Sequence, residues 1–106
     1  MKKPKDVYYE TSADAGLFAT SLAGHDCGQT YMVVGEYEGY IYLADGKSKT
    51  LTQPKRKNKK HVQLIKRGYP VDIRERLVAR RTVRDEEIRL AIKQYERERA
   101  TCQNQI

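Results

Sequence analysis

The sequence predicts a mainly β chain with helical structure at its C-terminal end, namely a small five-stranded antiparallel barrel followed by one or two helices. Short runs rich in Val and Tyr, separated by glycine dipeptides, occupy residues 16–67 without an intervening helix. After Gly68 the apolar residues recur with helical spacing. A chain of 106 residues fits one domain. We therefore expect a flexible or lightly docked N-terminal arm (1–15), the barrel (16–67), a helical appendage (68–100) and a frayed tail (101–106).

The first three strands are expected before residue 45. The first is expected at 17–22, and the glycine-containing stretch 24–29 breaks it. Thr30–Tyr37 reads as the second strand, and Glu38-Gly39 gives a two-residue connection to a third strand at Tyr40–Ala44. A barrel follows because short strands in an open sheet would leave exposed edges.

Two further strands are expected on either side of the most basic part of the chain. Asp45-Gly46 is a turn dipeptide, so 47–52 is predicted as the fourth strand. Pro54 is predicted to end it, because proline cannot donate to a ladder, and 61–65 is the fifth. Alternation then assigns one set of side chains to the interior and turns Tyr31, Tyr40 and Tyr42 away from it. The predicted interior is Met32, Val34, Ile41, Leu43, Val62 and Leu64, with Leu17 and Leu51 as additions.

Two helices are expected after residue 70. Asp72 and Glu75 have capping-box spacing, which predicts a helix over 73–80. Thr82 is predicted to cap a longer helix, whose first turn carries three acidic residues where the macrodipole favours them. An apolar stripe follows, and we expect it to pack within the chain, with a second protein as the alternative. The stripe is Ile88, Ala91, Ile92 and Tyr95.

Positive charge is concentrated in one segment. Residues 47–71 contain nine basic and no acidic residues, whereas the net charge is −4 before this segment and +2 after it. Such a block is either a solvated loop or the contact for a polyanion, and we favour a nucleic acid. Tyr40 and Tyr42 are candidates for stacking on unpaired bases, although burial under the C-terminal helix is the alternative for both. The candidate basic contacts are Lys47, Lys49, Lys55, Arg56, Lys57, Lys59, Lys60 and His61.

Other classes of function receive little support. Cys27 and Cys102 lie far apart and form no Cys-x-x-Cys pair, so we expect no metal and no cofactor, and a disulfide between them stays open. The sequence contains no phosphate-binding loop, dinucleotide fingerprint or nucleophile elbow, so we expect no enzyme. No apolar run reaches membrane-spanning length and no secretory leader is apparent, so a cytoplasmic protein is expected.

An ordered set of four segments resembles a known family. The loop 24–29 with the strand after it resembles a KOW motif, and the stretches 42–47, 54–62 and 85–92 resemble the remainder of small bacterial KOW-domain RNA-binding proteins related to the ribosomal L-fourteen-e family. The similarity covers roughly residues 16–95. One departure is that Cys27 and Gln29, rather than basic residues, flank the second glycine.

The resemblance implies an SH3-like barrel that binds RNA, with ribosomal RNA or the ribosome as the partner. It adds Gly24 and Gly28 to the expected RNA contacts, through backbone amides of their loop. Two other functions stay open at this point: a protein-interaction adaptor that uses the Ile88, Ile92 and Tyr95 face, and a transcription-associated KOW module whose partner is RNA polymerase.

Overall fold

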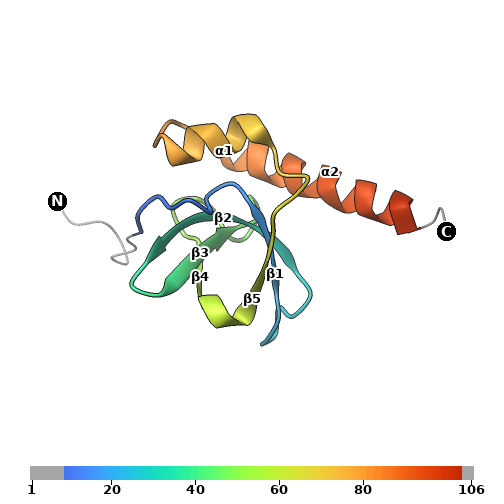
Figure 1. Ribbon diagram of the computed structural model, residues 1–106, viewed down its shortest axis with the longest axis horizontal. Coiled ribbons are helices and arrows are strands. Elements are labelled where there is room, and N and C mark those ends of the chain that lie inside the picture. Colours follow the sequence, from blue (N-terminus) through green and yellow to red (C-terminus); the bar gives the residue numbers. More distant parts are fainter. Residues whose placement is uncertain (1–8, 104–106) are drawn as a thin grey trace.

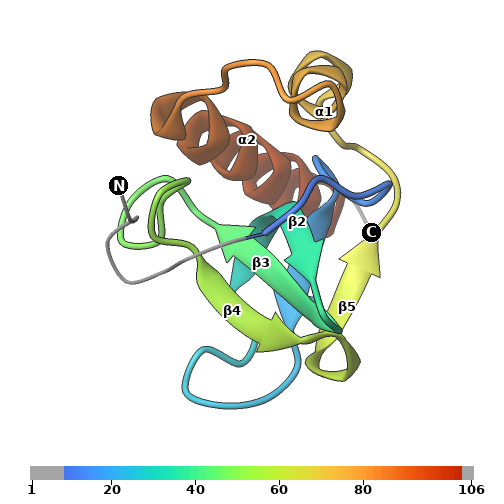
Figure 2. The ribbon, with the colours of Figure 1, turned by 90° about the vertical axis from the view of Figure 1, so that its left-hand side faces the viewer.

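A five-stranded antiparallel sheet forms the body of the protein. The computed structural model describes residues 9–103, and residues 100–103 by their helical backbone alone. The sheet order is β4-β3-β2-β1-β5. Both helices lie on the same side of it, as Figures 1 and 2 show. The strands are β1 (Phe18–Ser21), β2 (Thr30–Tyr37), β3 (Tyr40–Ala44), β4 (Lys55–Asn58) and β5 (Val62–Ile65), and a 3-10 turn, η2 (Lys59–His61), joins the last two.

Four of the five strands lie close to their predicted positions, and β4 does not. The predicted strand 47–52 is part of a loop, in which Asp45 Oδ1 accepts hydrogen bonds from the backbone N–H groups of Lys47 and Lys49. Pro54 precedes β4 instead of ending a strand. This prediction was wrong because the basic residues were placed in the connection between two strands, whereas β4 pairs with β3 as an edge strand.

The two faces of the sheet carry separate apolar clusters, and the predicted interior mixed them. Met32 and Val34 pack toward the helices with Tyr42. Tyr31 and Val33 lie on the other face with Ile41, Leu43, Val62 and Leu64. The prediction therefore placed Met32 and Val34 of β2 on the same face as Ile41 and Leu43 of β3, whereas they lie on opposite faces. The register shift between Val33 and Gly35 contributes to this irregular alternation. Of the three tyrosines predicted to point outward, Tyr31 and Tyr42 are buried and Tyr40 is exposed.

The segment before β1 crosses β2 at a glycine. Glu10 pairs with Glu36 through two backbone hydrogen bonds of 2.8 Å. A Cβ placed on Gly35 would overlap the ring of Tyr9, so glycine permits this close approach. Residues 9–15 are therefore docked, as one of the two expectations for the arm had it. The rest of the predicted arm, 1–8, lies outside the described residues.

The helices cover the β1–β2–β3 face of the sheet. Helix α1 (Val71–Val78) begins two residues earlier than predicted, and Asp72 binds Arg76 at 2.8 Å instead of capping the helix. Helix α2 (Asp85–Gln103) has the predicted acidic first turn but begins after Thr82. Because α2 continues through residue 103, the predicted frayed tail does not include 101–103, and 104–106 lie outside the described residues.

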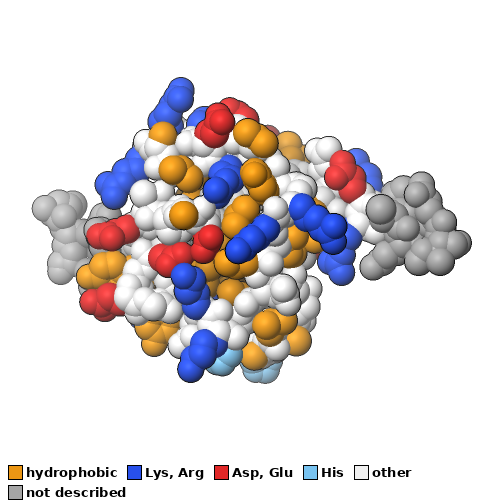
Figure 3. Space-filling model, in the orientation of Figure 1, with side chains coloured by type: hydrophobic (Ala, Val, Ile, Leu, Met, Phe, Trp, Pro, Cys, Tyr) orange, Lys and Arg blue, Asp and Glu red, His pale blue; other side chains and the backbone are white. Residues whose placement is uncertain are grey.

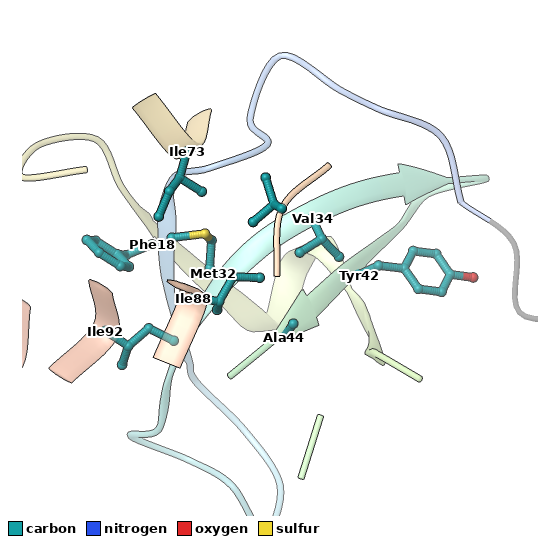
Figure 4. Close-up of a cluster of buried hydrophobic side chains, with 9 residues drawn as sticks. Phe18, Met32, Val34, Tyr42, Ala44, Ile73, Ile88 and Ile92 are labelled. Atoms are coloured by element: carbon teal, nitrogen blue, oxygen red, sulfur yellow. The ribbon is translucent and has the colours of Figure 1, made fainter. Parts of the chain in front are cut away.

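The predicted stripe on α2 packs within the chain. Ile88 and Ile92 are buried against Phe18 and Met32 (Figure 4). Tyr95 stacks on Phe18 with ring centroids 4.6 Å apart. The expectation of internal packing is confirmed, and a partner could reach Ile88 and Ile92 only by displacing α2. No helix in the described part of the chain is both long and apolar enough to span a membrane.

Candidate nucleic-acid interface

Strand β4 divides the basic segment into side chains that point inward and side chains that point outward. Its register places Lys55 opposite Leu43 and Lys57 opposite Ile41, which belong to the apolar cluster away from the helices. Arg56 alternates to the other side, opposite Tyr42. Lys55 and Lys57 therefore lie on the face of the sheet that carries the buried cluster away from the helices. Arg56 lies on the opposite face, near exposed Tyr40, which is two residues from Tyr42 along β3.

The inward lysines converge on one carboxylate. Asp26, in the loop between β1 and β2, accepts a hydrogen bond of 3.1 Å from Lys57 Nζ, and Lys55 Nζ lies 3.8 Å away. The hydroxyl groups of Ser21 and Tyr31 also donate to Asp26, each at 2.9 Å. The side chains of Asp26 and Lys57 are only 14% and 12% exposed. This arrangement ties the glycine-containing loop to the edge strand.

Two pKa values reflect the cluster. Burial alone would raise the pKa of Asp26, but hydrogen bonds from Lys57, Tyr31 and Ser21 outweigh it and hold the pKa well below its ordinary value. Burial and the neighbouring Asp26 carboxylate raise the pKa of Tyr31. Asp26 is therefore ionised and Tyr31 is a neutral donor at physiological pH, as the hydrogen bonds require.

The basic segment is less free than its sequence indicated. In addition to Lys55 and Lys57, Lys59 pairs with Glu36 at 3.2 Å, although both of these side chains are more exposed. A segment without internal counter-charges was expected to need solvent or a polyanion. Three of its lysines instead have carboxylate partners supplied by β2 and the loop before it.

The glycine loop does not offer its amides in the way the resemblance implied. The N–H groups of Cys27, Gly28 and Gln29 donate within the loop and to Ser21, at 3.2, 2.8 and 2.9 Å. Gly24 and Gly28 are exposed and have positive φ, so their conformation serves the turn. The amide of Gly28 is therefore already engaged within the chain, and the expected contact of this loop with RNA stays a prediction.

Only one of the two candidate stacking tyrosines is accessible. Tyr42 is 7% exposed, lies among the residues beneath the helices, and stacks on Tyr9 with centroids 5.2 Å apart. Its proposed role in base stacking is excluded by this burial. Tyr40 is 37% exposed, and the guanidinium of Arg56 lies over its ring at 4.5 Å. The pair presents a planar cation on an aromatic support, a surface on which a base can stack.

A shallow groove with lysines on its rim runs along β5. Its volume is about 460 Å³. Lys60 and Lys66 are exposed, and no carboxylate among residues 9–103 forms an ion pair with either side chain. His61 is exposed next to them. The groove is lined by Lys59, Lys60, Val62, Gln63, Leu64 and Lys66. Sequence reasoning counted Lys66 within the basic segment but did not select it as a contact.

The remaining candidates lie elsewhere. Lys47 lines a separate groove with Arg89 and Lys93 of α2, where Asp45 and Glu96 offset their charge. Lys49 is half-buried in the same loop. The structure therefore does not bring these two lysines to the β5 groove. Figure 3 shows that blue and red side chains alternate across one face of the molecule and that the histidines lie at its lower edge.

No family model and no curated protein matches the chain. Within residues 9–103, no group of His, Cys, Asp or Glu side chains is arranged to hold a metal ion. Cys27 is an exposed free thiol. The side chain of Cys102 lies outside the described part of the chain.

Proposed function

We propose that the protein is a non-catalytic RNA-binding protein of the KOW type, with ribosomal RNA or a ribosomal particle as its ligand and a cytoplasmic location. The observation that carries this proposal is the groove along β5, which Lys59 and Lys60 of η2 line at one end and Lys66 lines at the other. Ammonium groups spaced along an edge strand suit the successive phosphates of an extended chain.

The proposed interface consists of the basic side chains that are exposed and not held by a buried carboxylate. Lys60 and Lys66 can approach phosphates directly. Lys59 can exchange Glu36 for a phosphate at small cost, because an exposed ion pair contributes only about 0–1 kcal/mol. Lys55 and Lys57 are held by Asp26, so they serve the fold first. Arg56 on Tyr40 adds a stacking surface for an unpaired base.

The sheet supports the finer assignment of an SH3-like barrel. The last strand, β5, returns beside β1 through a single 3-10 turn from β4, and β1 pairs with both β2 and β5. Pairing of the first and last strands is one way for a small antiparallel sheet to curl toward closure. A KOW module is proposed from this topology and from the sequence segments that resemble one.

Salt dependence tests the proposal. Changing Lys59, Lys60 and Lys66 together to Gln should flatten the slope of log K against log salt for a single-stranded RNA by about 2, because each phosphate contact contributes about 0.7. A matched control removes three exposed charges from the helical region through R80Q, R81Q and K93Q. An unchanged slope in the β5 variant, or an equal change in the control, would contradict the proposed interface.

The two alternatives differ in partner. An adaptor that acts through Ile88, Ile92 and Tyr95 is disfavoured, because these residues pack within the chain. A transcription-associated module would use the same charges. Sedimentation of a lysate through sucrose at low and high salt separates it from the ribosomal proposal: co-migration with ribosomal particles that is lost at high salt supports the latter, and co-migration with RNA polymerase alone contradicts it.

A further inference from the structure

A further groove, separate from the β5 groove and from the groove lined by Lys47, lies between the C-terminal half of α2 and the sheet. The helix extends past the edge of the sheet toward the C-terminal end of the chain (Figure 1). Below it, β1 and β5 form a floor, and the residues after β5 close one end. The volume is about 640 Å³, within the usual range for small-molecule sites of about 300–1,000 Å³. The lining residues are Thr20, Gln63, Ile65, Arg67, Gly68, Tyr95, Glu98 and Arg99.

The groove combines a fixed aromatic wall with unused polar groups. Tyr95 forms the wall, and its stack on buried Phe18 holds the ring in place. Thr20 and Gln63 lie opposite each other in the β1–β5 register and line the floor. Neither side chain has a hydrogen-bond partner among the described residues. A hydroxyl and an amide beside an aromatic ring match the needs of a flat ligand with hydrogen-bonding edges.

The rim of the groove carries positive charge. Arg67 and Arg99 are exposed, and neither forms an ion pair with a carboxylate of residues 9–103. Glu98, the acidic residue of the lining, accepts a hydrogen bond of 3.2 Å from Gln94. The two guanidinium groups therefore suit an anionic group attached to the flat ligand, and arginine can bind a phosphate in bidentate geometry.

Gln63 connects this groove to the lysine groove. It lines both of them, from the middle of β5. Val62 and Leu64 of the lysine groove lie on the face away from the helices, and β5 is at the edge of the sheet. A strand of RNA whose phosphates follow Lys59, Lys60 and Lys66 can therefore reach the floor beneath α2 by passing around this edge at Gln63. We propose that the groove under α2 binds one unpaired base of that strand, with the base against Tyr95, its edge on Gln63 and Thr20, and a neighbouring phosphate between Arg67 and Arg99. This inference rests on the proposed function and deepens it, because it assigns base selectivity to a site separate from the phosphate contacts.

The test measures selectivity with fluorescein-labelled decamers of uridine, cytidine and adenosine. Fluorescence anisotropy gives the dissociation constant of the full chain for each decamer. We expect the wild type to prefer one decamer by about threefold to tenfold, the effect of one or two hydrogen bonds. Q63A should reduce the preference below twofold without changing the salt slope. Q53A is the matched control, because Gln53 is also exposed but lies in the loop before β4, away from both grooves.

The arginine rim is tested with the same decamers. R67Q with R99Q should weaken binding of all three and lower the salt slope by about 0.7, because the two arginines hold a single phosphate. R80Q with R81Q removes the same charge near the opposite end of α2 and should leave the slope within experimental error. Gln63, Arg67 and Arg99 are exposed, so these variants are expected to fold, and circular dichroism checks this.

The outcomes separate this site from the proposed function. Binding of every decamer with equal affinity, a preference that survives Q63A, or an arginine pair indistinguishable from its control would overturn the base site while leaving RNA binding intact. Failure to bind any decamer at low salt would overturn the proposed function and this site together.

Discussion

Replacement of Asp26 by Asn should destabilise the protein far more than loss of one surface charge. The change keeps the size of the side chain and removes only its charge and one acceptor oxygen. In the wild type this carboxylate accepts from Ser21, Tyr31 and Lys57, and the first two of these residues are buried. In the variant the Asn amide donates where it must accept, so at least one buried donor loses its partner.

The magnitude follows from those partners. A hydrogen bond to a charged group contributes about 1.5–3 kcal/mol, and breaking a buried ion pair costs about 3–5 kcal/mol. Asp26 keeps 14% of its side chain exposed, and Asn retains one acceptor, so we expect a loss of about 2–3 kcal/mol. For a domain of this size each kcal/mol shifts Tm by about 4–8 °C, so Tm should fall by about 10 °C or more.

Urea denaturation, followed by circular dichroism, measures this loss. D14N is the control, because the Asp14 carboxylate has no hydrogen bond or ion pair among the described residues. The folded-state pKa of Asp26 is depressed, so its stabilising contribution is complete above the unfolded pKa of about 3.9 and disappears as the pH falls toward the folded value. The gap between wild type and D26N should therefore be constant at neutral pH and narrow below about pH 4. A loss no larger than that of D14N, or a gap that widens in acid, would refute this role for Asp26.

Two further predictions concern contacts made by helix α2. G46A should destabilise the fold by more than G39A: both glycines have positive φ, but only at Gly46 would a Cβ meet the α2 backbone, with Arg89 N at 2.8 Å, whereas nothing lies within 4 Å at Gly39. Equal losses of Tm would contradict that packing. E87Q should lose its effect on stability in acid, because hydrogen bonds from Arg76 and the Arg84 backbone lower the pKa of Glu87 from 4.5 to about 2. The stabilising contribution of the Glu87 carboxylate is therefore complete above its unfolded pKa and is lost as the pH falls toward about 2. If the denaturation midpoints of E87Q and wild type differ near pH 2 by as much as they do at neutral pH, this role for Glu87 is contradicted.

Local patterns in the sequence located most elements of this fold. The turn dipeptides and Val- and Tyr-rich runs found β1, β2, β3 and β5, and helical spacing found the buried side of α2. The prediction failed at β4, whose four residues, Lys-Arg-Lys-Asn, have low strand propensity. Pairing with β3 and the Asp26 contacts override that propensity. Neither interaction can be read from neighbouring residues, because Asp26 and Lys57 are 31 positions apart.

The phase of β2 shows a second limit of pattern reading. Val33 and Val34 are both buried, each on its own side of the sheet, because the sheet carries apolar clusters on both faces. A strand covered on both sides has no clear alternation, so parity alone cannot assign its faces. Parity likewise turned Tyr42 outward, whereas burial under the C-terminal helix, the stated alternative to base stacking, is what the structure shows for it.

The basic segment serves the fold and the surface at once, and strand alternation explains how. Its formal charge treats all nine basic residues alike, yet β4 turns Lys55 and Lys57 toward Asp26 and leaves Arg56 outside. Inward-pointing charges also protect an edge strand from pairing with another chain. The number of basic residues in the segment therefore exceeds the number of side chains that are free to contact a ligand. Lys60 and Lys66, which line the β5 groove, are among the free ones. If RNA is the ligand, its affinity should depend on Lys60 and Lys66 more than on the denser stretch before them.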